Sequence, residues 1–376
     1  MPMDEMPRFA HGGDVYRELP DGVTEWLDFS ANINPRGILP EVRRAITDNI
    51  DGLIHYPDTE AARLRQAISS CYAVPYDSVL PCNGGAELLY LFAHVVRPRR
   101  VLLPVPSFND YERAALAAGA EVIYEPLQES EAFRPDVERL RDAMTTADCL
   151  MLGNPNNPTG VLMTREQLLP LIDRAEETGT WLIMDESFLD FRPDSERYTV
   201  AGLVADHPHL LVLHSLTKFF ALPGLRLGFG IAAPELMERL LAGKDVWNVN
   251  LLAQAAGTAA LELMTAKPGL IREMQDGVRR EALLLAMSIS ELPGMRVYEP
   301  SVNFVFLNMN ADVTVPHRHS GALTAALRQK GILVRDCANY PGLDGESYIR
   351  LAVTDSRKRM KLIFALEDTL REMEML

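Results

Sequence analysis

A regular alternation of short apolar runs with helical patterns constrains the fold of this chain more than any other feature. Between residues 100 and 231, runs of branched apolar residues are bounded by turn residues, and helical patterns lie between several of them. This order is typical of a mostly parallel sheet covered by helices, because parallel neighbours need a long crossover connection. The predicted strands span residues 100–104, 121–125, 148–153, 181–185, 209–214 and 225–231, and the predicted helices include 107–118, 135–144 and 165–178.

The pattern changes after about residue 267. A long amphipathic stretch covers residues 268–292, strands follow near 303–308 and 347–353, and a closing helix begins at Asp355. The segment before Pro40 has many turn residues and little periodicity, which indicates an arm. With 376 residues, 47% of them hydrophobic, the chain can bury the core of an α/β fold. We expect an N-terminal arm (1–40) packed with the small domain, a large domain (41–267) with a mostly parallel sheet flanked by helices, and a smaller α+β C-terminal domain (268–376).

Composition narrows the class of partner. Asp and Glu number 52 against 37 Lys and Arg, and the net charge of -15 gives no general attraction to nucleic acid or to anionic membranes. An anionic small substrate would need its own local arginines. The chain starts without an apolar signal region, and no apolar run reaches the roughly 18 residues of a membrane span, so we expect a cytoplasmic enzyme. Widely spaced cysteines are interpreted as reduced thiols: Cys71, Cys82, Cys149 and Cys337.

The most specific chemical motif is Ser215-Leu216-Thr217-Lys218, with Arg226 eight residues further on. It directly follows an apolar strand pattern. Two hydroxyl groups and an arginine could hold a phosphate while the lysine amine forms an imine. The alternative is an ordinary lysine exposed at the end of a strand.

Two further motifs follow apolar strands. Asp185 directly follows the apolar run 181–184. A carboxylate at the carboxyl end of a strand could pair with the nitrogen of a pyridine ring. Asn157 lies in the run 154–160, where its amide could bind the phenolic oxygen of the same ring. The alternatives are a helix N-cap for Asp185 and a proline-glycine turn for 154–160.

A phosphate site is also predicted where Gly85 and Ala86 precede the helical pattern 87–96, because free N–H groups at a helix start bind anions. Phe108 could stack on a planar ring. The alternatives are a plain glycine turn and a core aromatic.

No metal site is expected. The His207/His209 and His317/His319 pairs have no carboxylate or cysteine near them in ligand spacing and are interpreted as surface loop residues. Glycine-rich dinucleotide and nucleotide-phosphate motifs are absent from the sequence.

Taken together, these motifs resemble the fold-type I pyridoxal-phosphate aminotransferases over nearly the whole chain. Within that family the chain resembles the histidinol-phosphate aminotransferase branch and, more closely, the threonine-phosphate decarboxylases of cobalamin synthesis. Four stretches carry the closer resemblance: residues 11–13, 28–35, 215–228 and 337–343.

The resemblance implies a role for each matching position around pyridoxal 5'-phosphate. Lys218 would be the Schiff-base lysine, Asp185 the partner of the pyridine nitrogen, and both are the implied catalytic residues. Asn157 would bind the phenolic oxygen, and Phe108 would stack on the ring. The implied phosphate ligands are Gly85, Ala86, Ser215, Thr217 and Arg226.

The resemblance also implies partners. Tyr56 matches a tyrosine that reaches the cofactor phosphate of a second subunit, so a homodimer is implied. Arg350 would bind the α-carboxylate of a phosphorylated amino acid, with Asn157 close to the substrate. The implied ligands of the substrate phosphate are His11 with Gly12, Asn32 and Arg335. The alternative for Arg335 is an exposed strand residue paired with Asp336 or Glu346.

The implied reaction is decarboxylation of L-threonine O-3-phosphate to (R)-1-aminopropan-2-yl phosphate in cobalamin synthesis. One departure from the aminotransferases supports it: Phe188 stands where they commonly carry a tyrosine, and the decarboxylases share the phenylalanine. Two alternatives stay open. The first is a histidinol-phosphate or related aminotransferase, and the second is an inactive aminotransferase-like domain that serves as a binding module.

Overall fold

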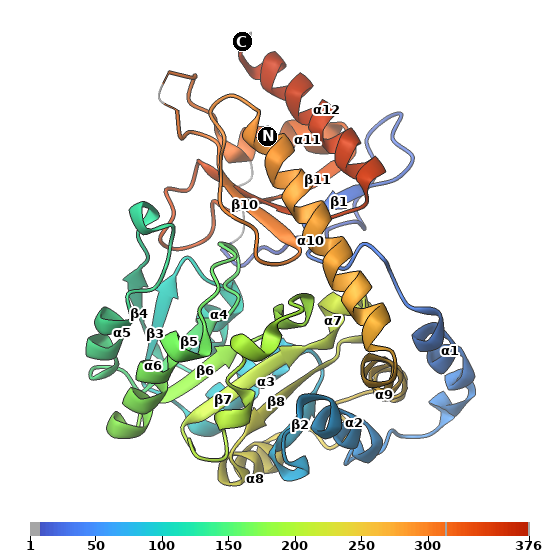
Figure 1. The fold of residues 1–376 in the computed structure, drawn as a ribbon, viewed down its shortest axis with the longest axis vertical. Helices are drawn as coiled ribbons and strands as arrows, with labels where there is room; N and C mark the ends of the chain where they lie inside the picture. Colours follow the sequence, from blue (N-terminus) through green and yellow to red (C-terminus); the bar gives the residue numbers. More distant parts are fainter. Residues whose placement is uncertain (1–7, 313, 375–376) are drawn as a thin grey trace.

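The structure is a computed structural model that describes residues 8–312 and 314–374. It has two parts, visible as a lower and an upper lobe in Figure 1, and the long helix α10 (Pro268–Ser290) reaches from one to the other. Helix α9 (Leu251–Ala266) ends just before it. We propose the boundary between the domains at Lys267, between these two helices.

The lower lobe is built on a seven-stranded sheet. Strands β3, β4, β5, β6 and β7 pair in parallel, whereas β8 is antiparallel to both of its neighbours, β7 and β2. The predicted α/β fold with a mostly parallel sheet is therefore confirmed. The strand order is β2 (Val79–Cys82), β8 (Gly228–Ala232), β7 (Leu210–Ser215), β6 (Trp181–Asp185), β5 (Cys149–Gly153), β3 (Arg100–Val105) and β4 (Glu121–Pro126).

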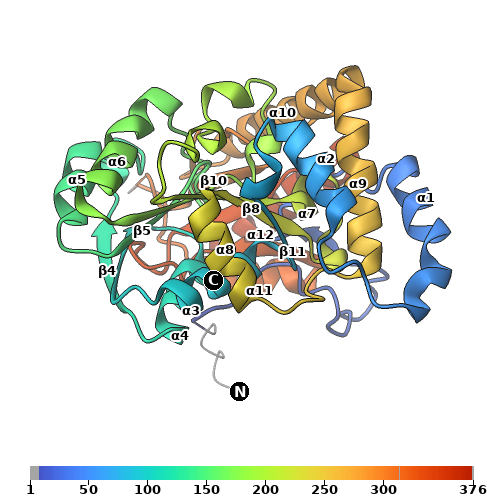
Figure 2. The same cartoon turned by 90° about the horizontal axis from the view of Figure 1, so that it is seen from below.

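Helices cover both faces of this sheet (Figure 2). One face packs on α3 (Gly85–Val96), α4 (Asn109–Ala117) and α8 (Pro234–Gly243). The other face packs on α2 (Ala62–Tyr72), α5 (Val137–Met144), α6 (Arg165–Thr178) and α9. Successive side chains of a strand point to opposite faces, so Ile183 of β6 joins the first core while Leu182 and Met184 join the second. Continuous apolar strands are what a sheet buried on both faces requires.

The upper lobe has a five-stranded sheet with α10, α11 (Ser320–Gln329) and α12 (Ser356–Glu374). Its strand order is β1 (Leu27–Phe29), β11 (Ile332–Asp336), β12 (Tyr348–Ala352), β10 (Phe304–Asn308) and β9 (Arg296–Val297). Strand β1 comes from the arm and pairs in parallel with β11, and Phe29 enters the core of this lobe. The sequence pattern did not predict β1, because three residues are too short for periodicity and their partner is far along the chain. Residues 1–7 of the predicted arm lie outside the described residues.

Some elements differ from the sequence prediction. The strand predicted at 225–231 begins only at Gly228, because a 3-10 turn (Pro223–Leu225) precedes it and Arg226 has a left-handed φ of 57°. The helix predicted at 107–118 begins at Asn109. Helices α1 (Pro40–Asp48), α2 and α9 were not predicted, nor was the short helix α7 (Leu216–Phe219). None of the helices in the described part of the chain is long and apolar enough to cross a membrane.

Candidate active site

A cavity of about 300 Å³ lies at the carboxyl ends of β5, β6 and β7, with the arm and the strands β11 and β12 on its other side. Ligands of open α/β sheets gather at this end of the strands. Every predicted site residue except Tyr56 lines the cavity: His11, Gly12, Asn32, Gly85, Ala86, Phe108, Asn157, Asp185, Ser215, Thr217, Lys218, Arg226, Arg335 and Arg350.

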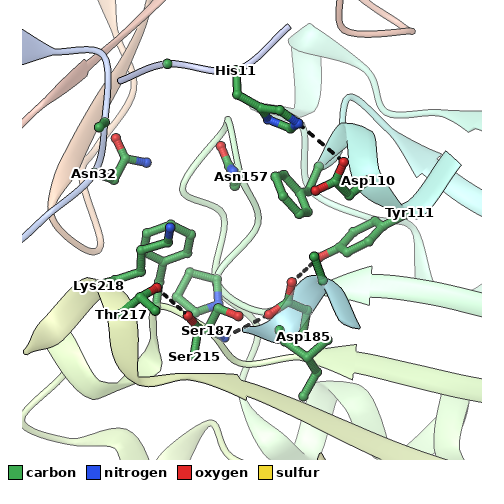
Figure 3. A pocket seen from close by; sticks show the side chains of 18 of the residues that line it. His11, Asn32, Asp110, Tyr111, Asn157, Asp185, Ser187, Ser215, Thr217 and Lys218 are labelled. Atoms are coloured by element: carbon green, nitrogen blue, oxygen red, sulfur yellow. Dashed lines mark hydrogen bonds and ion pairs between the residues drawn. The ribbon is translucent and has the colours of Figure 1, made fainter. Parts of the chain in front are cut away.

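Lys218 lies in the short helix α7, directly after β7, and its side chain borders the cavity (Figure 3). Burial lowers the pKa of the Lys218 amine to about 8, and the positive charges of Arg226 and Arg350 act in the same direction. The backbone carbonyl of Lys218 accepts a hydrogen bond from the N–H of Asn34 at 3.0 Å. With a pKa of about 8, roughly one Lys218 amine in ten is neutral at pH 7, against about one in a few thousand for an ordinary lysine, and attack on an aldehyde requires the neutral form. The interpretation of Lys218 as an exposed surface lysine is not supported.

Asp185 ends β6 and is buried beside the cavity. Its Oδ1 accepts a hydrogen bond from the N–H of Ser187 at 2.9 Å, and its Oδ2 accepts one from the Tyr111 hydroxyl at 2.7 Å. Burial raises the pKa of Asp185, and the two hydrogen bonds oppose that shift. Each carboxylate oxygen has two lone pairs. The carboxylate therefore caps the turn after β6 and still has acceptors for a ring nitrogen.

Tyr111 was missed by the sequence reasoning. Tyr111 lies three residues after Phe108, a spacing that places the two side chains on the same face at the start of α4. Their rings pack edge to face with the centroids 5.6 Å apart. Phe108 borders the cavity while Tyr111 reaches Asp185. The same segment adds Asp110 to the cavity wall, and the turn after β6 adds Ser187. The spacing from Phe108 was the only signal in the sequence that could have found Tyr111.

A cradle for an anion lies beside Lys218. The hydroxyls of Ser215 and Thr217 lie 2.8 Å apart, and the guanidinium of Arg226 lies against Gly84, where a Cβ would come within 2.5 Å of its Nη2. Gly84 also has a φ of +81°, a conformation that glycine adopts readily. The N-terminus of the twelve-residue helix α3 opens at the adjacent Gly85. These groups fit the phosphate of pyridoxal phosphate.

A buried ion pair lies near Asp185. Nε2 of His214, on β7, is 3.1 Å from Oε2 of Glu186. The Glu186 carboxylate also accepts hydrogen bonds from the Thr199 hydroxyl at Oε2 and from the N–H of Val200 at Oε1. Burial acts to lower the pKa of His214, but the contact with Glu186 outweighs it, so the pKa is raised. A cationic His214 favours the ionised form of Asp185. Sequence reasoning missed this pair because His214 lies on β7 and Glu186 directly follows β6, so only the pairing of the two strands brings them together.

Two arginines lie on the opposite side of the cavity. Arg335 of β11 and Arg350 of β12 are directly paired across the antiparallel strands, and they are only 4% and 5% exposed. The guanidinium of Arg350 donates to Oδ1 of Asn157 and, at 2.8 Å, to the carbonyl of Ser30. Like charges directly opposite on a sheet are destabilising. A ligand with negative charge would relieve that repulsion.

Arg335 is held by the arm and by its own loop. Its Nη2 donates to the carbonyl of Ala10 at 2.9 Å and to Oδ1 of Asn339 at 2.6 Å, and its guanidinium lies 4.9 Å from the centre of the Tyr340 ring. The interpretation of Arg335 as an exposed strand residue is wrong, because the arm covers it.

The arm contributes polar groups to the cavity wall. Nε2 of His11 lies 3.3 Å from Oδ1 of Asp110, and its ring is 5.7 Å from that of Phe108 (Figure 3). Oδ1 of Asn32 is buried and has no hydrogen-bond partner among the described residues. At Gly12 a Cβ would come within 2.2 Å of the Ser30 carbonyl, so glycine allows the two arm segments to pass. A buried acceptor without a partner is costly, and a donor on a ligand would satisfy it.

Tyr56 lies outside the cavity of its own chain. It is 76% exposed and stacks on Trp247 with the ring centroids 4.3 Å apart. Its role in the site of a second subunit stays a prediction. Phe188 lines the cavity and packs edge to face on Phe304 at 5.3 Å.

The chain is similar in sequence and in fold to pyridoxal-phosphate enzymes of known family. The family model for aminotransferase class I and II matches residues 24–366. Threonine-phosphate decarboxylase from Salmonella typhimurium is 36% identical over 366 residues, which cover 96% of each chain. The structure of a histidinol-phosphate aminotransferase from Clostridium acetobutylicum has a TM-score of 0.83 and 29% identity, over 92% of this chain and 99% of that one. L-threonine-O-3-phosphate decarboxylase from Porphyromonas gingivalis has a TM-score of 0.76 and 26% identity, over 91% and 99%.

Proposed function

This chain belongs to the aminotransferase class I and II family of pyridoxal-phosphate enzymes, and on that premise we propose that it decarboxylates L-threonine O-3-phosphate to (R)-1-aminopropan-2-yl phosphate in cobalamin synthesis. The observation that carries the proposal is the pairing of Arg335 with Arg350 on the side of the cavity formed by β11 and β12. Threonine phosphate has two anionic groups, a carboxylate and a phosphate. Two adjacent guanidinium groups match that pair of charges.

The phosphate is the group that sets the pose of the substrate. We assign it to Arg335, His11 and Asn32, which line one end of the cavity. Arginine can donate two parallel hydrogen bonds to a phosphate, and Asn32 has an amide to add. Arg350 and Asn157 then receive the α-carboxylate. Fixing both ends of the substrate would determine which bond at Cα is presented for cleavage.

Pyridoxal phosphate, when bound, supplies an electron sink for the bond at Cα that breaks. Asp185 would hold the ring nitrogen, and the contact with Glu186 raises the pKa of His214, whose positive charge when protonated favours the ionised form of Asp185. The amine of Lys218, with a pKa of about 8, can hold or release a proton at Cα near neutral pH. In a decarboxylation the carboxylate would leave as carbon dioxide, and Lys218 would supply the proton that takes its place at Cα. In a transamination Lys218 would instead remove the proton of Cα.

The second of these outcomes is transamination, and it is the alternative function. It is supported by the similarity to a histidinol-phosphate aminotransferase, with a TM-score of 0.83. An inactive binding module is a third reading. Against it stand Lys218 and Asp185, because a cavity that only binds has no need for an amine of lowered pKa beside a buried carboxylate.

A parallel assay distinguishes the three readings. The holoenzyme is given threonine phosphate, serine phosphate or histidinol phosphate, each with 2-oxoglutarate, and carbon dioxide and glutamate are both measured. We expect carbon dioxide from threonine phosphate without glutamate. Glutamate from histidinol phosphate would replace the proposal by the aminotransferase. An enzyme that binds pyridoxal phosphate but releases neither product would support the binding module.

We also propose that the enzyme is a homodimer in which Tyr56 reaches the cofactor phosphate of the other subunit. Supporting it, exposed apolar side chains gather around Tyr56 and Trp247, namely Ile50, Leu53, Ile54 and Val246. A Tyr56→Phe variant keeps the ring on Trp247 and removes only the hydroxyl, so cofactor retention should weaken. Mixed with Lys218→Ala subunits, it should form hybrid dimers with one undamaged site. Absence of recovery after confirmed subunit exchange would contradict this role of Tyr56, because it lies outside the cavity of its own chain.

A further inference from the structure

Two histidines stand side by side on the surface of the small domain, away from the cavity. His317 and His319 flank Arg318 on the segment that leads into α11, and His319 has the extended φ and ψ of −97° and 122°. Alternate side chains of an extended segment point in opposite directions. Arg318 is therefore buried and donates to the carbonyl of Pro293 at 2.6 Å, while both imidazoles are exposed with ring centroids 5.2 Å apart.

A carboxylate faces both imidazoles. Oε2 of Glu346, in the turn before β12, lies 3.8 Å from Nε2 of His317 and 3.6 Å from Nδ1 of His319. One ligand atom from each of the three residues falls within 4.8 Å of the others. Ligands bound at about 2.0–2.2 Å from a tetrahedral ion lie about 3.3–3.6 Å apart. Small side-chain rotations would therefore bring the three atoms onto one ion.

The backbone that carries these side chains is braced. The amide of Asn310 donates to the carbonyl of Arg318 at 2.8 Å and to Oγ of Ser347 at 2.9 Å, and it accepts from the N–H of Arg318 at 2.9 Å. The N–H of Ser320 donates to the carbonyl of Glu346 at 2.7 Å. The histidine segment and the glutamate turn are thus fixed to each other without a metal. A site that is already assembled loses little entropy on binding.

We propose that His317, His319 and Glu346 bind a divalent transition-metal ion such as Zn²⁺ or Ni²⁺. Two imidazoles and one carboxylate are ligands that suit Zn²⁺, Ni²⁺ and Co²⁺, whereas Mg²⁺ and Ca²⁺ prefer oxygen alone. This replaces the sequence expectation that the pair is a plain surface loop, because the fold brings Glu346 from a distant part of the chain. The ion does not touch the cavity, so its effect is to join two surface segments.

The other histidine pair is a natural control. Nδ1 of His207 lies 2.8 Å from the carbonyl of Leu203, and Nδ1 of His209 lies 2.7 Å from Oε2 of Glu176. Each of these imidazoles has a short contact of its own, whereas Nε2 of His317 lies 3.3 Å from the amide nitrogen of Asn310, a contact that a bound metal ion would replace. Among the described residues, three possible metal ligands come together only at His317, His319 and Glu346. The two pairs share the same spacing in sequence, and only one of them faces a common carboxylate.

The experiment is calorimetric titration of the untagged holoenzyme with ZnCl₂ and with NiCl₂, beside the variants His319→Ala, Glu346→Gln and His209→Ala. We expect one ion per chain, with binding lost in His319→Ala and weakened about ten-fold or more in Glu346→Gln. His209→Ala should bind as the parent does. Saturating metal should also raise the Tm of the parent by roughly 2 °C, because only the folded chain presents the site.

Two results would overturn the proposal. One is no binding at millimolar metal by the parent protein. The other is stoichiometric binding that persists in His319→Ala and Glu346→Gln, or that is lost equally in His209→Ala, because the ion would then bind elsewhere, for example at the cofactor phosphate. His319 and Glu346 are exposed and His209 is half-buried against Trp181, so circular dichroism of each variant must match that of the parent.

Discussion

On one side of the cavity Lys218, Asp185 and Ser215 stand at the ends of adjacent strands of a single sheet, whereas on the other side the ligands come from separate segments. His11 and Asn32 belong to the arm, and Arg335 and Arg350 to the small-domain sheet. We call these the cofactor side and the substrate side. On the cofactor side, the register of β5, β6 and β7 brings the ends of these strands together. The substrate side depends on contacts between distant segments, such as the bond from Arg335 to the Ala10 carbonyl.

This difference in how the two sides are held fits their different tasks, alignment with a cofactor and admission of a substrate. A parallel sheet buried on both faces holds its strand ends rigidly, which suits groups that must stay aligned with a cofactor ring. The part of the arm before β1, which carries His11, should open at a lower free energy than a sheet core, which suits the entry of a substrate. The predictions below test each side separately, in order of decreasing effect.

The largest effect is expected for Lys218→Ala. Loss of the amine should abolish turnover and the imine absorbance of the holoenzyme, because nothing else in the cavity can form that bond. The substrate side should be intact, so calorimetry should still show binding of threonine phosphate. Circular dichroism should match that of the parent. Retained turnover would contradict the assignment of Lys218.

Asp185→Asn should keep the cofactor bound but slow the chemical step by about 10² to 10³ in kcat, because a neutral amide cannot stabilise a protonated ring nitrogen. Tyr111→Phe is the matched control, since it removes only the hydroxyl that donates to Asp185 at 2.7 Å. Its effect should be much smaller. A near-normal rate in Asp185→Asn would reduce this carboxylate to a cap of the turn at Ser187.

On the substrate side, substitutions of Arg335 and Arg350 should have different kinetic effects. Arg335→Ala loses a charge-assisted contact of about 1.5 to 3 kcal/mol, which corresponds to a rise of about ten-fold or more in KM for threonine phosphate. Unphosphorylated threonine should hardly respond, since it offers Arg335 nothing to bind. Arg350→Ala should impair both substrates, because both carry the α-carboxylate.

Steady-state kinetics on both substrates is the measurement. Equal losses on threonine and threonine phosphate in Arg335→Ala would show that this arginine supports the fold. The phosphate assignment would then rest on His11 and Asn32.

The two sides also differ in how far the sequence predicts them. The residues on the cofactor side follow apolar strands directly, so local pattern was enough to nominate Lys218, Asp185 and Asn157. What local pattern missed depends on packing between elements. Tyr111 reaches Asp185 only because α4 packs beside β6, and His214 meets Glu186 only because β6 and β7 are neighbours.

On the substrate side, the residue types and their local pattern were not enough to identify the ligands. Arg335 and Arg350 were nominated through the family resemblance, and their direct pairing follows from the register of β11 and β12. The strand β1 was missed because its pairing with β11 joins segments about three hundred residues apart. Its three residues carry no pattern that specifies such a long-range partner.

The smallest effect concerns the stability of the apoenzyme. The pKa of Lys218 is lowered to about 8 in the folded chain and is about 10.4 in an unfolded one. Between these pH values the unfolded chain binds more protons, so the free energy of unfolding should rise with pH from about 8 to about 10.4. Below pH 8 the penalty for the buried charge is fully present. Lys218→Met should remove both the penalty and the rise.

At pH 7 the Lys218→Met apoenzyme should therefore be more stable than the parent. We expect about 1 to 2 kcal/mol rather than the roughly 3.3 kcal/mol of the full shift, because the amine borders the cavity and water there reduces the penalty. Arg335→Met should instead lower the free energy of unfolding by about 1 to 3 kcal/mol, since the carbonyl groups that Arg335 binds would be left buried without a donor. Urea unfolding of the three apoenzymes at pH 7 and pH 9.5 measures both changes. If the parent and Lys218→Met share the same pH slope, the amine is not desolvated, and the cofactor side would carry no stability cost for its chemistry.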